Sequence, residues 1–249
     1  MRILAFLMVI CTLSCASSDK NKRFSLIHTE IGTSYLKDKK YALAFRELFT
    51  AVEIDPKNEV AHNNLALTYL SSQKPEQAKE HFLEAIKLNP KYTDAITNLG
   101  ALYLSEQQYN LAKEQFEIAK KDLTYTEPEK LNANLGATYF HLGDFVKAEE
   151  FLKQSILSDR KYCPAHRYYG ATLYHLNLLD RAQKAIEHAI GLCKTEKYPE
   201  LFYYGGLTYY KLGDTTKANA KWKELEGFYP NHSYVKEINT YQNIIEKAL

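Results

Sequence analysis

Two cysteines and two histidines have a spacing that suits either a metal site or a disulfide. Cys163 and His166 lie at the start of one predicted helix, and His188 and Cys193 lie at the end of the next. If these helices form an antiparallel pair, the two ends are neighbours. Thiolate and imidazole are ligands of zinc, whereas two adjacent thiols can also oxidise to a disulfide or stay free. The residues alone leave these three alternatives open.

A glycine-containing segment invites comparison with a nucleotide-binding loop. Residues 134–148 read NLGATYFHLGDFVKA. No strand is predicted before them, and the glycines have neither the Walker spacing nor the dinucleotide-binding spacing, so the sequence argues against phosphate binding. No set of serine or cysteine with histidine has the spacing of a nucleophile and its base. We therefore expect no enzymatic activity, no cofactor and no small-molecule substrate.

The N-terminus has the pattern of an export signal. Arg2 precedes an apolar run at residues 3–13, and small residues follow at 14–18. A helix formed by this run is about 16 Å long, roughly half of the ~30 Å hydrocarbon core, so it is too short to span a membrane. The segment TLSC at residues 12–15 resembles a bacterial lipoprotein box, in which the cysteine is lipidated and becomes the mature N-terminus.

We expect Cys15 to carry a lipid anchor, with a signal peptide before it (1–14) and a short polar tether that starts at the cysteine (15–24). No aspartate follows the cysteine, which in the lipoproteins that this segment resembles indicates the outer membrane, here its periplasmic face. Ordinary signal cleavage after Ala16 is the alternative, and it would give a soluble periplasmic or secreted protein.

Export also bears on the cysteine cluster. Thiols at neighbouring helix ends are expected to oxidise in an oxidising compartment, which favours a disulfide between Cys163 and Cys193. Free thiols and a zinc site remain the alternatives.

The charge balance indicates the kind of partner. The chain has 32 basic and 30 acidic residues and no long basic run, so it lacks the charge pattern of a nucleic-acid-binding protein. Its 20 tyrosines are many for 249 residues, and some of them are expected at the surface. We expect protein partners, no nucleic acid, and contact with a membrane through the N-terminal lipid.

An internal repeat with a period of 34 or 36 residues organises the rest of the chain. A small residue recurs, an alanine follows it by twelve residues, and a bulky residue follows the alanine by four. The small residues are Gly32, Ala66, Gly100, Gly136, Gly170 and Gly206. This pattern resembles the tetratricopeptide repeat, a pair of amphipathic helices that must stack on its neighbours because one pair cannot bury its apolar face alone.

The resemblance implies an all-α fold, a right-handed superhelical solenoid of six helix pairs with a C-terminal capping helix. Six tetratricopeptide repeats would cover residues 25–232, and the capping helix would cover 233–249. The repeat bounds are 25–58, 59–92, 93–128, 129–162, 163–198 and 199–232. In such repeats the first helix of each pair lines a groove, where we expect a partner to bind.

Two rows of side chains are predicted to face this groove. Asparagine recurs at one repeat position, and a carboxamide can both donate to and accept from a peptide main chain. A second row becomes aromatic toward the C-terminal half, and aromatic side chains are frequent binding anchors. The alternative is that both rows only pack against neighbouring helices. The predicted partner-binding residues are Asn64, Asn98, Asn134, Phe140, Tyr174, Tyr203, Tyr204 and Tyr210.

The combination of a lipoprotein box, a short tether and six repeats resembles one family, the pilotins of type IV pilus biogenesis. The stretched junction KDLTYTEPEKLNANLG after the third repeat is part of the resemblance. It implies a non-enzymatic outer-membrane lipoprotein that binds and escorts the pilus secretin and promotes its outer-membrane localisation and multimerisation. The alternative is a scaffold for another envelope protein, such as a peptidoglycan hydrolase or the outer-membrane assembly machinery.

Overall fold

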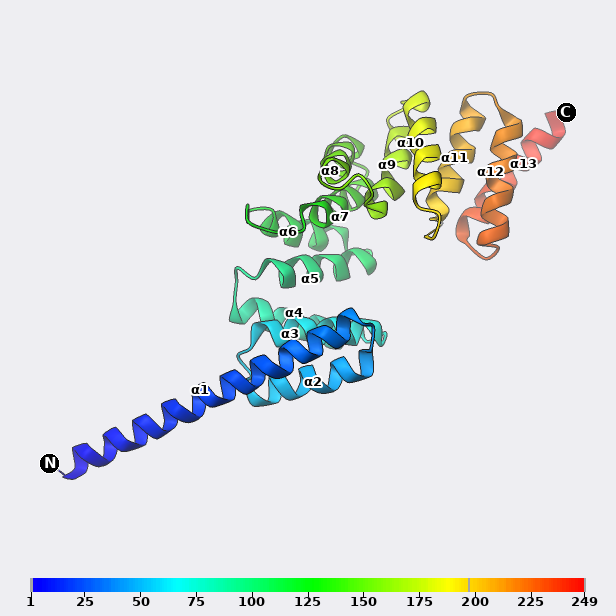
Figure 1. The fold of residues 1–249 in the computed structure, drawn as a ribbon. Coiled ribbons are helices and arrows are strands. Elements are labelled where there is room, and N and C mark those ends of the chain that lie inside the picture. Colours follow the sequence, from blue (N-terminus) through cyan, green and yellow to red (C-terminus); the bar gives the residue numbers. More distant parts are fainter. Residues whose placement is uncertain (1, 197, 249) are drawn as a thin grey trace. The chain divides into compact units, whose positions relative to one another are not determined.

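The computed structural model describes the backbone of residues 2–196 and 198–248 and the side chains of residues 19–196 and 198–245. Over this described part the chain forms helices and no strands (Figure 1). The helices are α1 (Arg2–Lys37), α2 (Tyr41–Ile54), α3 (Glu59–Ser71), α4 (Pro75–Leu88), α5 (Thr93–Ser105), α6 (Tyr109–Ala119), α7 (Pro128–His141), α8 (Phe145–Ser158), α9 (Cys163–His175), α10 (Leu179–Leu192), α11 (Pro199–Lys211), α12 (Thr215–Phe228) and α13 (Ser233–Ala248). None of those searched is both long and apolar enough to cross a membrane.

The helices belong to two compact units. Unit 1 (Met1–Glu106) contains α1 to α5, and unit 2 (Gln107–Leu249) contains α6 to α13. In unit 1, α1 packs on α2, α3 packs on α4, and α5 packs on α4. In unit 2, α7, α9 and α11 each pack on the helix that follows, and α13 packs on α12 and α11. This confirms the predicted all-α tetratricopeptide fold.

Each helix pair is held by a small residue that faces a bulky one. A Cβ atom added to Gly136 would lie 2.5 Å from Leu152 Cγ, so only glycine lets α7 approach α8 this closely. Gly32 and Leu48 make the equivalent contact between α1 and α2. The recurring alanines at the second-helix position are fully buried, namely Ala44, Ala78, Ala112, Ala148, Ala182 and Ala218. The small and bulky residues recur at fixed spacing because the two helices of each pair pack closely at these positions.

The turns inside the pairs use left-handed backbone. Gly143 and Gly213 have φ of +79° and +83°, and the next residue, Asp144 or Asp214, caps the following helix by accepting a hydrogen bond from a backbone N–H three residues on. The corresponding turns in the other pairs place non-glycine residues in this conformation, with φ between 56° and 61°. These residues are Lys39, Gln73, Gln107 and Asn177.

The N-terminal helix begins to pack at Ser25. The Ser25 side chain is fully buried and donates a hydrogen bond to the carbonyl of Ala51, whereas residues 19–24 are exposed. The segment 15–24, predicted to be a tether, lies within α1. The side chain of Cys15 lies outside the described residues, so the lipid anchor stays a prediction.

Candidate functional site

Aromatic side chains from three neighbouring helices meet in unit 2 and form a cluster that we call the aromatic wall: Phe140, Tyr168, Tyr174, His175 and Tyr204. Phe140 and Tyr204 are buried, Tyr168 and Tyr174 are half-buried, and His175 is exposed. Phe140 lies in the last turn of α7, Tyr204 lies in α11, and the others lie in α9. The Phe140 ring centroid lies 5.3 Å from that of Tyr168 and 6.0 Å from that of Tyr204, and the Tyr174 ring lies 5.5 Å from that of Tyr204. The wall therefore brings together three of the predicted partner-binding residues, Phe140, Tyr174 and Tyr204.

One contact of the wall occurs twice, one repeat apart. His141 Nε2 shares a hydrogen bond of 3.3 Å with the Tyr168 hydroxyl, and His175 Nε2 shares one of 3.1 Å with the Tyr204 hydroxyl. Each imidazole also stacks on an aromatic ring from the other side, with centroids 4.8 Å apart for Tyr109 and His141. The equivalent stack is between Phe145 and His175, at 4.2 Å. Each cluster thus holds the hydroxyl of one tyrosine, Tyr168 in α9 and Tyr204 in α11.

Both imidazoles are neutral near pH 7. Desolvation lowers the pKa of His141, and the charge of Arg167 lowers it further. Desolvation also lowers the pKa of His175, with a smaller effect from Lys211. A neutral imidazole can donate from one ring nitrogen and accept at the other, so each of the two can orient a tyrosine hydroxyl without adding charge to the surface.

An ion pair between a half-buried arginine and a buried glutamate lies beside the wall. Arg167 Nη2 donates a 2.6 Å hydrogen bond to Glu200 Oε1, and Glu200 is only 6% exposed. The guanidinium carbon lies 4.9 Å from the ring centroid of Tyr168 and 5.2 Å from that of Tyr198. Arg167 Nε and Glu200 Oε2 are buried and have no hydrogen-bond partner within the described residues. The pair therefore retains one donor and one acceptor.

The other two predicted aromatic residues contact the capping helix. Tyr203 stacks on Tyr234 of α13 with centroids 4.1 Å apart, and its hydroxyl donates to Glu237. Tyr210 packs against Trp222 and against Tyr241 of α13. In the structure these tyrosines fasten α13 to α11 and α12, so a packing role accounts for both.

The predicted asparagine row is divided between the units. In unit 1, the Asn64 side chain donates to the Thr33 hydroxyl at 2.7 Å and accepts from Asn63, which in turn accepts from Asn98 at 3.0 Å. Asn134 belongs to unit 2, and its half-buried carboxamide makes no hydrogen bond within the described residues. A peptide that binds Asn64 or Asn98 must compete with these internal bonds.

The cysteine cluster forms a covalent link in unit 2. A disulfide joins Cys163 to Cys193, with their Cα atoms 5.7 Å apart, and it ties the start of α9 to the end of α10. His166 Nε2 is hydrogen-bonded to the carbonyl of Arg160, and the His188 ring lies 5.4 Å from that of His166. Within the part of the chain searched, no group of three or more His, Cys, Asp or Glu side chains could hold a metal ion.

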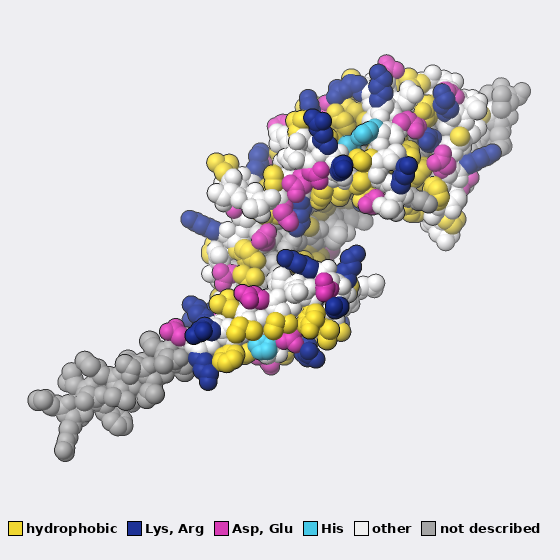
Figure 2. Space-filling model, in the orientation of Figure 1, with side chains coloured by type: hydrophobic (Ala, Val, Ile, Leu, Met, Phe, Trp, Pro, Cys, Tyr) yellow, Lys and Arg dark blue, Asp and Glu magenta, His cyan; other side chains and the backbone are white. Residues whose placement is uncertain are grey.

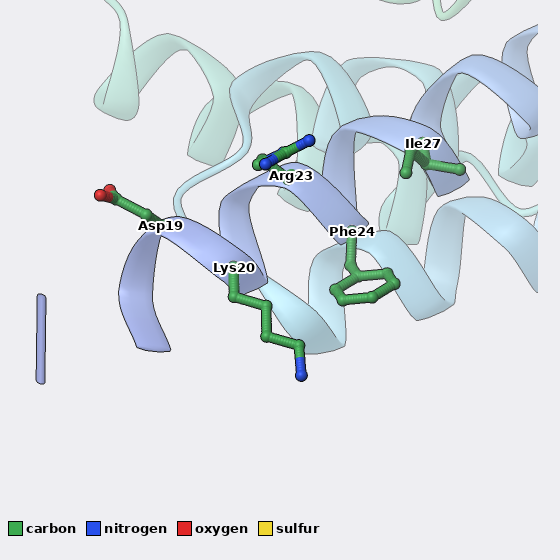
Figure 3. A pocket seen from close by; sticks show the side chains of 5 residues that line it. All are labelled: Asp19, Lys20, Arg23, Phe24 and Ile27. Atoms are coloured by element: carbon green, nitrogen blue, oxygen red, sulfur yellow. The ribbon is translucent and has the colours of Figure 1, made fainter. Parts of the chain in front are cut away.

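A separate surface cavity of about 360 Å³ lies on α1 in unit 1 (Figure 3). It is lined by Asp19, Lys20, Arg23, Phe24 and Ile27. Phe24 and Ile27 are about half exposed, and the Lys20 ammonium lies 5.8 Å from the Phe24 ring centroid. The cavity has an open apolar surface with charged edges and no convergent catalytic groups.

Figure 2 shows one face of the molecule, on which charged side chains of both signs are interspersed in each unit. Lysine and arginine side chains do not gather there into one patch, in agreement with the balanced sequence composition.

Comparison with known protein families identifies the repeat. Four segments match the tetratricopeptide repeat, at residues 60–92, 81–114, 129–162 and 200–232. The chain contains tetratricopeptide repeats. Such repeats stack into extended surfaces that bind other proteins, which agrees with a site made of aromatic side chains on adjacent helices. No curated protein sequence matches the chain.

Solved structures share the fold along most of the chain. PilF of Pseudomonas aeruginosa is 20% identical, with a TM-score of 0.74 over 90% of this chain and 99% of PilF. PilW, a type IV pilus biogenesis factor, is 23% identical, with a TM-score of 0.73 over 86% of this chain and 97% of PilW. YrrB, a tetratricopeptide protein with an unusual peptide-binding site, gives a TM-score of 0.60 at 20% identity over 78% of this chain and 97% of YrrB. The matches to PilF and PilW confirm that the fold of this chain resembles that of tetratricopeptide proteins of pilus biogenesis.

Several residues of the site were not predicted from the sequence. His141 and His175 occupy the same repeat position, 34 residues apart, and the aromatic residues that stack on them, Tyr109 and Phe145, are 36 apart. These recurrences were visible in the sequence. The pairing of Arg167 with Glu200 has no such signal, because it occurs once.

Proposed function

We propose that this chain is a non-enzymatic outer-membrane lipoprotein that binds and escorts the secretin of type IV pili and promotes its localisation and multimerisation. The lipid on Cys15 would hold the protein at the periplasmic face of the outer membrane, and the repeats would bind the secretin subunit or a protein that assembles with it.

One observation carries this proposal: the match to PilF and PilW extends over nearly the whole of each of those chains. Coverage of 99% of PilF and 97% of PilW means that the correspondence is not confined to a few repeats. The stacked repeats support the proposal, because helix pairs that stack in this way form an extended surface that binds other proteins.

Deletion of the gene tests the proposal directly. We expect loss of heat-stable secretin multimers from the outer membrane and loss of surface pili, both restored by the wild-type gene. Secretin multimers that remain intact in the outer membrane of the deletion strain would contradict the proposed function and would favour another envelope client.

A cysteine pair in the export signal gives a matched control for the anchor. Cys15→Ser removes the proposed lipidation site, whereas Cys11→Ser changes a neighbouring cysteine in the same segment. We expect the first variant to leave the membrane fraction and to fail in restoring outer-membrane multimers, and the second to behave as the wild type. Membrane attachment of Cys15→Ser would contradict the assignment of the anchor.

A further inference from the structure

Two histidine side chains meet in unit 1, between the helices of one pair. His62 Nδ1 in α3 lies 2.9 Å from His81 Nδ1 in α4. His62 Nε2 lies 3.2 Å from the carbonyl oxygen of Pro56, which can only accept, so this nitrogen carries the proton and Nδ1 presents a lone pair to His81. Histidines that bind metal ions are typically held in this way, by donation of the other ring N–H to a carbonyl. His62 is buried and His81 is half-buried, so an ion can reach the pair from the His81 side.

The same fixing of a histidine recurs in unit 2 without a second imidazole in contact. His166 Nε2 is hydrogen-bonded to the carbonyl of Arg160, again six residues earlier. The nearby His188 ring lies 5.4 Å from the His166 ring, centroid to centroid, and no hydrogen bond joins the two. Over the described part of the chain, His62 and His81 are thus the pair that brings two imidazole nitrogens together.

The separation of these two nitrogens suits one class of metal ion. A metal–imidazole bond is about 2.0–2.1 Å long, so two nitrogens 2.9 Å apart subtend an angle of about 90° at an ion that they share. A right angle is typical of the square-planar and tetragonal coordination of Cu(II) and Ni(II), whereas tetrahedral zinc requires nitrogens about 3.3 Å apart. Of the divalent first-row ions, Cu(II) binds nitrogen donors most tightly.

Glu84 can supply a third donor from the next turn of α4. Residues three apart share a helix face, so Glu84 lies on the same face as His81. Desolvation lowers the pKa of both imidazoles and the charge of Glu84 raises it, so the carboxylate lies near the pair. In the structure this carboxylate accepts from Lys87 Nζ at 2.9 Å and does not complete a set of three donors. Lys87 is 75% exposed, and an exposed ion pair contributes little, so Glu84 can rotate toward a bound ion at small cost.

We propose that His62 and His81 bind a copper(II) ion through their Nδ1 atoms, with Glu84 and water in the remaining positions. His81 donates from Nδ1 to His62 in the structure. When the ion binds, this nitrogen gives up its proton and His81 Nε2, which has no partner within the described residues, takes one up. The ion then replaces the hydrogen bond as the link between α3 and α4. The inference rests on the geometry of this pair and is independent of the proposed function.

Copper binding by the full mature chain tests this inference. The probe is Cu(II) buffered with glycine, titrated by isothermal calorimetry, and electron paramagnetic resonance reports the bound nitrogens. We expect saturable binding and an axial spectrum with two imidazole nitrogens. The Tm should rise with free copper, because an ion that binds only the folded chain stabilises it. Absence of saturable binding, or a spectrum with fewer than two imidazoles, would overturn the proposal.

Matched asparagine substitutions assign the ion to this pair. His81→Asn keeps an N–H donor near the place of Nδ1, so His62 can keep its hydrogen bond, but a neutral carboxamide is a poor ligand for Cu(II). We expect the affinity for copper to fall at least about tenfold. His188→Asn, the same change beside His166, is the control and should bind copper as the wild type.

Circular dichroism establishes that both asparagine variants are folded. If His81→Asn does not fold, His81→Gln is measured instead, since it keeps the amide on a longer side chain. Wild-type affinity in the folded variant at position 81, or an equal loss in His188→Asn, contradicts the assignment.

Two variants at the third donor should act in opposite directions. Glu84→Gln removes the carboxylate and should weaken copper binding about tenfold. Lys87→Gln releases Glu84 and removes a positive charge that acts on His62, so it should strengthen binding. Unchanged affinity in Glu84→Gln, or a change of the same sign in both variants, would overturn the assignment of Glu84.

Discussion

Substitution of Gly136 by alanine tests the packing that places the aromatic wall. A Cβ atom at this position would lie 2.5 Å from Leu152 Cγ, 2.7 Å from Leu152 Cδ2 and 3.1 Å from Leu152 N. Leu152 is fully buried, and the third contact is with backbone, so rotation of the leucine alone does not remove the overlap. Overpacking of this kind costs about 1–3 kcal/mol.

Helix propensity acts in the opposite direction. Alanine is favoured over glycine inside a helix by about 1 kcal/mol, so we expect a net loss of roughly 1 kcal/mol for Gly136→Ala. For a chain of this size that corresponds to a fall in Tm of about 2–4 °C. Gly227→Ala is the control, because a Cβ at Gly227 meets no atom within 4 Å. The control should be neutral or slightly stabilising.

Thermal and urea unfolding followed by circular dichroism measure the difference. Leu152→Ala alone should cost about 3 kcal/mol or more, because it leaves a cavity. In the double variant Gly136→Ala and Leu152→Ala, the new methyl group occupies part of that cavity. The loss of stability should therefore be at least 0.5 kcal/mol smaller than the sum of the two single losses, since contacting pairs couple by about 0.5–3 kcal/mol. A Gly136→Ala protein that is as stable as Gly227→Ala, or additive losses in the double variant, would refute the close-packing argument.

Three further predictions concern a turn, the disulfide and the histidines. Gln73→Gly should raise Tm by a few degrees, because Gln73 has a φ of 56° and a side chain in left-handed backbone costs about 1–2 kcal/mol. The greater freedom of glycine in the unfolded chain offsets part of this gain. Cys163→Ser should lower stability by about 3–4 kcal/mol under oxidising conditions, since the bond to Cys193 closes a loop with a separation of 30 residues, and it should have no effect when both proteins are reduced. Desolvation lowers the folded-state pKa of His141 and His175, so the unfolded chain binds protons first. The stability that the two neutral histidines contribute is therefore fully retained above their unfolded-state pKa of about 6.5 and is lost as the pH falls below it. Replacing both histidines by glutamine should make the fall in Tm between pH 7 and pH 5 less steep.

The sequence predicted the helix pairs because close packing constrains residue size at fixed positions. Position 136 must hold a small residue because position 152 holds a large one. The same requirement recurs in every helix pair, so the period of the sequence pattern indicates the fold. The aromatic wall was only partly predictable. Phe140, Tyr174 and Tyr204 recur along the chain, but their contacts depend on how the rings of three helices turn toward each other.

Hydrogen bonds were harder to predict than packing. The asparagine row was visible as Asn64 and Asn98, but the choice between binding a peptide and bonding internally depends on two other side chains. Thr33 and Asn63 lie within hydrogen-bond distance and bond to the carboxamides of Asn64 and Asn98. Neither residue belongs to the repeat pattern that indicated the row. The sequence does not distinguish a polar side chain that is hydrogen-bonded within the protein from one that is free to bind a partner.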